Sequence, residues 1–181
     1  STGGLHTCVL DIEGKIFCWG KGNFGQLGNN TLTTISHIPV EVDMSGNLEN
    51  IRFSQINSGY EHTCAITETK KEIYCWGRNY DGQLGDGTVD YKMRPEKVKF
   101  GNLDDDVIFK AVSASVIHTC AIDNMNRVYC WGKNEGFFSN SEGTTLIPSK
   151  IDTNIILKNG NLVSIVTGTT HNCVLDDMGE V

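Results

Sequence analysis

The sequence has no run of basic residues longer than Lys70-Lys71. With 22 acidic and 15 basic residues, its formal net charge is −7. Because a nucleic-acid interface needs a basic stripe that displaces counterions from phosphates, we expect no nucleic-acid partner. No segment approaches the roughly 18 consecutive apolar residues of a membrane span, so no membrane insertion is expected. A charged and then apolar leader is also missing before His6, and we expect both ends to be cut edges of a longer protein.

Apolar stripes with the 3.6-residue period of an amphipathic helix are missing as well, which argues against a helical repeat. The composition, 39% apolar and 20% charged over 181 residues, is ordinary for a folded globular protein. The 20 glycines and 7 cysteines are the unusual features. The chain is therefore expected to fold, and its cysteines and glycines carry the information about how.

Internal repetition organises the whole chain. Four similar segments read HTCVLDIEGKIFCWG, HTCAITETKKEIYCWG, HTCAIDNMNRVYCWG and HNCVLDDMGEV, and their histidines, separated by 56, 56 and 53 residues, are His6, His62, His118 and His171. Three tryptophans recur in step with them, 57 and 55 residues apart: Trp19, Trp76 and Trp131. A period near 55 with several short strands per unit indicates the blades of a β-propeller.

Within each unit, alternating apolar residues and turn residues predict four antiparallel strands. The fourth strand is expected to follow the only three prolines, at 39–42, 95–98 and 148–151. A strand that ends in a small-residue turn precedes every repeated histidine except the first. The predicted fold is all-β, a partial propeller of about three and a half repeats, divided into residues 1–49 (a first repeat without its first strand), 50–105, 106–156 and 157–181, a partial fourth repeat.

Cysteine spacing places one pair across each complete hairpin. The paired cysteines are 10, 11 and 10 residues apart, and the midpoint of each pair falls in the predicted turn. Residues that face each other across antiparallel strands have Cβ atoms about 4.5–5.5 Å apart, and the closer positions approach disulfide geometry. We predict three disulfides, which imply an oxidising compartment: Cys8–Cys18, Cys64–Cys75 and Cys120–Cys130.

The seventh cysteine, Cys173, belongs to the fourth copy, and its expected partner falls near position 183, past the last residue. Two alternatives to the disulfides stay open. His6, Cys8 and Cys18 could together offer ligands to zinc, although structural zinc sites favour four ligands and a C-x₂₋₄-C spacing. Free buried thiols in a reducing cell are the other alternative. Our expectation is that the chain holds no metal and no cofactor.

Three segments of the second unit resemble the repeat of the regulator of chromosome condensation family: SGYEHTCAI (Ser58–Ile66), YCWGRN (Tyr74–Asn79) and GQLGDGT (Gly82–Thr88). The first unit matches from His6 to Asn29, and the third departs at 137–140, where Gly-Gln-Leu-Gly is lost. The resemblance implies a seven-bladed propeller of roughly twice this length. Members of the family exchange nucleotide on a small nuclear GTPase, inhibit secreted β-lactamases, perceive ultraviolet light or act in microbial adhesion, so the fold leaves function open. Paired cysteines are not a feature of the nuclear members and are similar to those of secreted or surface repeat proteins.

Residues that recur in every unit are interpreted as structural. The histidines are expected to hydrogen-bond a strand or turn, since no nucleophile with a base and an orienting acid recurs near them. The tryptophans are expected to pack between blades rather than to stack on a ligand. The Gly-Gln-Leu-Gly segments at 25–28 and 82–85 are interpreted as tight turns, because neither has the strand-to-helix context of a phosphate-binding loop.

Two polar features remain. Asp104-Asp105-Asp106 could touch calcium, but three consecutive carboxylates do not share one face of an extended chain, which favours solvated charge. Asn29-Asn30-Thr31 is the only Asn-x-Ser/Thr sequence, and Asn29 is predicted to be exposed on a loop and to carry a glycan if the protein is secreted by a eukaryote.

Binding residues are expected where the repeat is broken, in the loops 32–37, 89–93 and 137–142, and at four side chains in particular: Asp90, Tyr91, Phe137 and Phe138. These features predict a non-enzymatic protein-interaction scaffold, secreted or at the cell surface, that binds a protein partner and serves as a subunit of a larger assembly. The alternative is a guanine-nucleotide exchange factor or another regulator of a small GTPase. A lyase or glycosidase would need paired carboxylates in a central cleft, and no such pair recurs.

Overall fold

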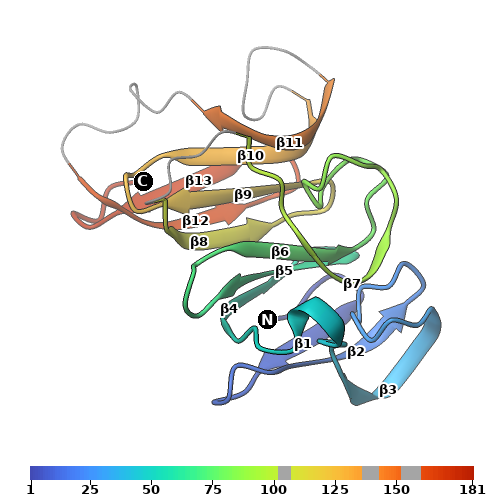
Figure 1. The fold of residues 1–181 in the computed structure, drawn as a ribbon. Coiled ribbons are helices and arrows are strands. Elements are labelled where there is room, and N and C mark those ends of the chain that lie inside the picture. Colours follow the sequence, from blue (N-terminus) through green and yellow to red (C-terminus); the bar gives the residue numbers. More distant parts are fainter. Residues whose placement is uncertain (102–106, 136–142, 152–159) are drawn as a thin grey trace.

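A computed structural model describes residues 1–101, 107–135, 143–151 and 160–181, and its strands form four antiparallel sheets that follow one another along the chain (Figure 1). The first sheet has the order β1 (His6–Leu10), β2 (Ile16–Gly22) and β3 (Thr33–Glu41). The second contains β4 (Phe53–Ser58), β5 (His62–Thr67), β6 (Ile73–Gly77) and β7 (Lys92–Lys97). The third contains β8 (Phe109–Ala114), β9 (His118–Asp123), β10 (Val128–Asn134) and β11 (Gly143–Ile151), and the fourth pairs β12 (Leu162–Thr167) with β13 (Asn172–Asp176).

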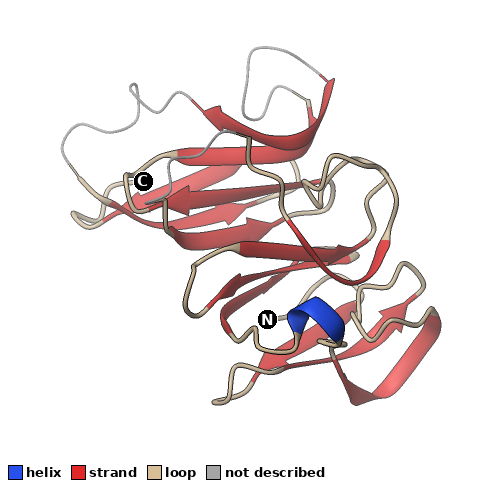
Figure 2. Ribbon diagram, in the orientation of Figure 1, coloured by secondary structure: helices blue, strands red, loops and turns tan. Residues whose placement is uncertain are grey.

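Each sheet is a blade, and we number the blades 1 to 4 in chain order. The first strands of successive blades, β1, β4, β8 and β12, lie next to one another. Among the described residues the single helical element is a 3₁₀ turn, Gly46–Leu48, between blades 1 and 2 (Figure 2). The predicted fold class, a partial β-propeller of antiparallel blades, is confirmed. No helix in the described parts of the chain is long and apolar enough to cross a membrane.

The hairpin between the second and third strands of the full repeat has the same design in successive blades. In blade 1 the Asp11 carboxylate accepts hydrogen bonds from the backbone N–H groups of Glu13 and Lys15 at 2.9 and 2.8 Å. Gly14 then has a positive φ of 76°. The equivalent residues of blades 2 and 3, Lys71 and Asn126, adopt φ angles of 53° and 61°, a region that side chains other than asparagine rarely visit. The extra residue of the blade 2 hairpin therefore lengthens the turn without changing the register of the strands.

One detail of the predicted strands is wrong. The fourth strands begin before the prolines, so most of the expected loop 32–37 belongs to β3, and Lys92 and Met93 belong to β7. Proline is tolerated because these strands lie at the outer edge of each blade, where its missing N–H leaves no ladder bond unmade. In blade 1 the place of the first strand is partly taken by Thr2, which forms an antiparallel bridge with Thr7.

The core lies between blades rather than within them. Each sheet turns one buried face toward the next, and aromatic side chains fill the spaces between blades 1 and 2 and between blades 2 and 3. Between blades 1 and 2, Trp76 and Tyr74 pack with Phe53 and Leu27. Between blades 2 and 3, Trp131 and Tyr129 pack with Phe109 and Leu84 in the same way. Packing between neighbouring blades therefore stabilises each blade, as expected of a repeat architecture.

Candidate functional site

The six paired cysteines lie inside the blades. All three predicted disulfides are present, and in each the two cysteines are directly opposite each other on neighbouring antiparallel strands: Cys8–Cys18, Cys64–Cys75 and Cys120–Cys130. The sulfur–sulfur distances are 2.07, 2.15 and 2.08 Å, and the Cα–Cα distance is 4.1 Å in each pair. None of the six is more than 1% exposed. Each blade with a complete hairpin is thus closed by a buried covalent link. Cys173 is exposed and stands opposite Val166 on β13.

A turn before each repeated histidine fixes the histidine backbone. In all four blades the N–H group three residues before the histidine donates to the histidine carbonyl, at 2.8–2.9 Å. The donors are Gly3, Gly59, Ser115 and Gly168. The first repeat therefore also has the small-residue turn that is predicted only before the later histidines. The sequence indicates this turn by a small residue three positions before the histidine, as in Gly3-Gly4-Leu5-His6.

A hydrogen-bonded node that joins each blade to the next contains the repeated histidine. Nε2 of His62 lies 2.9 Å from Oγ1 of Thr119, and this hydroxyl donates to the carbonyl of Gln83 at 2.8 Å. Since the hydroxyl hydrogen is used in that bond, Thr119 accepts from an Nε2–H of the histidine. The indole N–H of Trp131 donates to the same carbonyl at 2.9 Å.

The same node links blades 1 and 2. His6 Nε2 lies 2.7 Å from Thr63 Oγ1, and the Thr63 hydroxyl and the Trp76 indole both donate to the carbonyl of Gln26, at 3.2 and 3.1 Å. The last glycine of each Gly-Gln-Leu-Gly turn lies against the indole. A Cβ on Gly28 would stand 2.7 Å from Nε1 of Trp76. The repeated His, Thr, Trp and Gly-Gln-Leu-Gly therefore form one structural unit split between neighbouring blades.

Burial sets the protonation state of the histidines. It lowers the pKa of His62 to about 3 and the pKa of His6 to about 4, and it also lowers the pKa of His118. All three are therefore neutral near pH 7, and a neutral ring with its proton on Nε2 can make the bonds described above. A general acid or base works best with a pKa near the operating pH, so these rings are poorly suited to proton transfer.

The node changes where the repeat changes. Nε2 of His118 lies 2.8 Å from Oδ1 of Asn172, which replaces the threonine in blade 4. Trp76 and Trp131 are fully buried between blades, whereas Trp19 is half-buried. Trp76 and Trp131 each lie on the Gly-Gln-Leu-Gly turn of the preceding blade, and the described residues contain no such turn before Trp19. His171 is exposed for the corresponding reason, as no described blade follows it.

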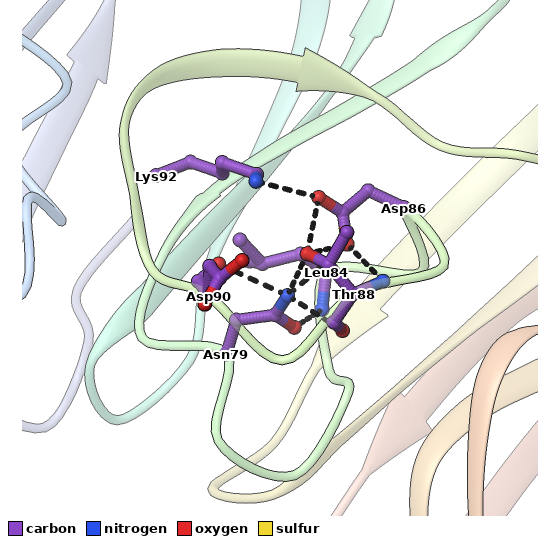
Figure 3. A network of polar contacts seen from close by, with 6 residues as sticks. All are labelled: Asn79, Leu84, Asp86, Thr88, Asp90 and Lys92. Carbon is purple, nitrogen blue, oxygen red and sulfur yellow. Dashed lines mark hydrogen bonds and ion pairs between the residues drawn. The ribbon is translucent and has the colours of Figure 1, made fainter.

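A polar network orders the long loop between β6 and β7 (Figure 3). Oδ1 of Asn79 accepts from the Leu84 N–H at 2.9 Å, and its Nδ2 donates to Asp86 Oδ1 and to the Asp90 carbonyl, both at 3.1 Å. Asp86 also accepts from the hydroxyl and N–H of Thr88. Sequence reasoning missed this network. Its signal was an asparagine three residues after the tryptophan, which recurs as the buried Asn134 of blade 3.

The charge of Asp86 is held inside this network. Burial alone would raise the pKa of its carboxyl, but hydrogen bonds from Thr88 and the Lys92 ammonium together hold the pKa below its ordinary value. The Lys92 Nζ to Asp86 Oδ2 distance is 3.1 Å. Lys92 is the first residue of β7, so the bond connects the middle of the loop to the strand that it enters. The loop is thereby fixed at both of its ends.

The predicted binding residues divide between described and undescribed parts. Asp90 and Tyr91 are exposed at the end of the ordered loop, and Tyr91 is 37% exposed. Phe137 and Phe138 lie outside the described residues, as does the acidic run 104–106.

The prediction that Asn29 is exposed is wrong. It stands at the position of Asp86 in blade 1, is half-buried, and its Oδ1 is covered without a hydrogen-bond partner.

An aromatic and charged cluster lies at the same end of the blades as this loop. The guanidinium of Arg78 lies 5.5 Å from the ring centroid of Tyr80, and the Tyr80 ring meets Phe24 of blade 1 edge-on at 5.6 Å. Arg78 also forms ion pairs with Asp81 at 2.9 Å and with Glu61 at 3.9 Å. Tyr80 is 56% exposed, so this cluster presents aromatic surface at the seam of blades 1 and 2. Arginine and tyrosine are enriched at the centres of protein interfaces.

The fold and the repeated node define a propeller built of similar blades, and comparison with known proteins gives its family. The family model described as the regulator of chromosome condensation (RCC1) repeat matches residues 13–66 and 72–122. The chain belongs to the RCC1 repeat family. It is 29% identical over 184 residues to the human probable E3 ubiquitin-protein ligase HERC6, covering 100% of this chain and 17% of that protein. It is 35% identical over 132 residues to the ultraviolet-B receptor UVR8 of Arabidopsis thaliana, covering 72% of this chain and 28% of that protein.

The fold agrees with a solved structure of the same family. Yeast RCC1 (Prp20), crystallised bound to Kap60, superposes with a TM-score of 0.78 at 20% identity, covering 98% of this chain and 42% of that chain. At this identity the likeness shows the fold alone. The chain spans 17% and 28% of the lengths of the two curated relatives, so it corresponds to a part of them.

Proposed function

We propose that this propeller segment is a non-enzymatic scaffold that binds a protein partner through the loops at the Tyr91 end of its blades. The observation that carries the proposal is the Asn79–Asp86 network, which holds a repeat-breaking loop in one conformation with Asp90 and Tyr91 exposed. A loop that is ordered before binding loses less conformational entropy when a partner docks. Among the described residues, no three His, Cys, Asp or Glu side chains come together as metal ligands, and the buried histidines are neutral structural groups.

We further propose that the protein functions outside the reducing interior of the cell, secreted or at the cell surface, as a subunit of a larger assembly. The support is the three buried disulfides, since such bonds persist in oxidising compartments. Mass spectrometry of the natural protein, with free thiols alkylated before reduction, tests this. Protection of the six paired cysteines is expected, and alkylation of all of them before reduction would refute the location.

Photo-crosslinking tests the interaction directly. A photoreactive amino acid replaces Tyr91, and in a control replaces Met125, which is 43% exposed in the β9–β10 hairpin at the opposite end of the blades. The expected result is a crosslinked protein that forms from position 91, is absent from position 125, and is lost when Asp90 is changed to lysine. Identical crosslinks from both positions would remove the proposal. The alternative, regulation of a small GTPase, is supported by the likeness to RCC1 and predicts faster release of a fluorescent guanine nucleotide from a GTPase when the chain is added.

A further inference from the structure

A polar pocket lies at the end of blade 2 opposite Tyr91, between the β5–β6 hairpin and the linker that leads from β3 to β4. We call it the hairpin pocket. Its volume is about 480 Å³, within the range of about 300–1,000 Å³ that is typical of small-ligand sites. Its lining residues belong to the described part of the chain and come from the linker (46–51), from the hairpin and its strands (67–74) and from Lys97 of β7.

Both walls of the hairpin pocket are held in place by hydrogen bonds and packing. In the linker, the Arg94 guanidinium donates to the Ser45 carbonyl at 2.7 Å, and Leu48 is buried in the core between blades 1 and 2. In the hairpin, the Glu68 N–H donates to the Arg52 carbonyl at 2.7 Å, which connects the hairpin to the end of the linker. A pocket that is ordered before binding needs little rearrangement to accept a ligand.

The hydroxyl of Tyr74 is the polar group that distinguishes this pocket. Tyr74 is only 8% exposed and lines the pocket, and its hydroxyl forms no hydrogen bond within the described residues. Burial, and then the nearby Glu72 carboxylate, raise the pKa of Tyr74, so the hydroxyl keeps its proton and is a hydrogen-bond donor. A largely buried donor without a protein partner favours a ligand that accepts a hydrogen bond from it.

Comparison of the blades shows that the fold does not require this hydroxyl. The equivalent residue of blade 3, Tyr129, donates its hydroxyl to the Asp123 carboxylate at 3.3 Å. Blade 1 has Phe17 at this position, which has no hydroxyl. In blade 2, Thr67 takes the place of Asp123 and leaves the Tyr74 hydroxyl without this acceptor. Blade 2 therefore keeps an unpaired hydroxyl at the position where it also has a pocket.

The charges and hydrogen-bonding groups of the lining favour a neutral ligand that is rich in hydroxyls. Two acidic and two basic side chains line the pocket, so no net charge selects an ion: Glu49, Glu72, Lys70 and Lys97. The amides of Asn47 and Asn50 both donate and accept, as the hydroxyls of a sugar do. Ile51 is the one aliphatic side chain of the lining, which leaves little surface for an apolar peptide side chain.

We propose that the hairpin pocket binds a neutral saccharide, with the Tyr74 hydroxyl donating to a sugar oxygen and the two asparagine amides bonding its other hydroxyls. A free sugar and a glycan carried by a partner protein offer the same chemistry. The pocket lies at the opposite end of the blades from the Tyr91 loop, so this inference goes beyond the proposed scaffold function and does not depend on it.

Ligand-observed NMR with the disulfide-bonded chain tests the proposal. Saturation-transfer difference spectra are recorded with the methyl glycosides of glucose, galactose, mannose and N-acetylglucosamine, and at least one of them is expected to bind. Tyr74→Phe removes only the hydroxyl and is expected to weaken that binding about three- to ten-fold, as the loss of one hydrogen bond would. Thr69→Trp places a large side chain on the exposed hairpin loop that borders the pocket, and it is expected to abolish binding.

Blade 3 supplies the matched control. Tyr129→Phe makes the same chemical change outside the pocket, and the affinity for the sugar is expected to change by less than about two-fold. Thermal unfolding of each variant shows that the blades are intact. Equal weakening by Tyr74→Phe and Tyr129→Phe would overturn the proposal, as would the absence of binding by every sugar probe.

A pair of protein probes distinguishes the two sources of the sugar. Ribonuclease B carries an N-linked glycan, and ribonuclease A is the same polypeptide without it. Binding of ribonuclease B and not of ribonuclease A supports a glycan on a partner protein, whereas binding of the methyl glycosides without ribonuclease B supports a free sugar. Equal binding of the two ribonucleases would show recognition of polypeptide and overturn the saccharide site. If the sugar probes fail while the crosslink from position 91 persists, the hairpin-pocket inference alone is wrong.

Discussion

Replacement of Thr119 by valine tests whether the hydrogen-bonded node stabilises the blades. The substitution keeps the shape of the side chain and removes the hydroxyl that accepts from His62 and donates to Gln83. His62 and Thr119 are fully buried, so no water is available to replace the lost bond to the Nε2–H. The Gln83 carbonyl keeps the bond from Trp131, so the stranded donor of the histidine sets the cost. An unsatisfied buried donor costs about 1–3 kcal/mol, and we expect Thr119→Val to lower the free energy of unfolding by about 2 kcal/mol.

The chain contains its own control for this experiment. Thr7 occupies the same position in blade 1, is only half-buried, and has no histidine of a preceding blade against it among the described residues. Thr7→Val is expected to change the free energy of unfolding by less than about 0.5 kcal/mol. The measurement is urea unfolding of the oxidised chain followed by tryptophan fluorescence. Equal effects of the two substitutions, or a loss below about 0.5 kcal/mol for Thr119→Val, would show that the node does not hold the blades together.

Three further predictions concern the same interior. The pKa values of about 3 for His62 and about 4 for His6 lie below the value of 6.5 for the unfolded chain. Between these values the unfolded state binds more protons than the folded state, so the contribution of the buried histidines to stability is complete above about pH 7 and decreases as the pH falls. Urea unfolding at pH 5 should therefore show a loss of about 2 kcal/mol per histidine in the free energy of unfolding. A stability that does not change from pH 7 to 5 would contradict this burial. Gly85→Ala places a Cβ 2.7 Å from Trp131 Nε1 at a φ of 68°, and thermal unfolding should show a cost of about 3 kcal/mol. Asn79→Ala should cost about 2 kcal/mol and raise amide hydrogen exchange in residues 84–91 alone; unchanged exchange there would mean that the network does not order the loop.

Local features of this protein could be predicted from the sequence because each depends on residues close together in the chain. The hairpins are predicted by apolar residues that alternate along each strand on either side of a turn. The cysteines of each blade are 10 or 11 residues apart, so the position of the turn alone places them opposite each other. The repeat of about 55 residues was equally visible. Strand limits were less well predicted, because a proline at the edge of a blade does not interrupt the strand as it would in the middle of a sheet.

Contacts between blades were decided only by the tertiary structure. Thr119 lies 57 residues from His62 and 36 from Gln83, and no local pattern indicates that these groups meet. The half-buried position of Asn29 has the same origin, since the neighbouring Gly28 lies against Trp76 of the next blade. Repetition in the sequence determines the strands, hairpin and disulfide of one blade. The packing of blades against one another determines which side chains are buried and which remain exposed to bind a partner.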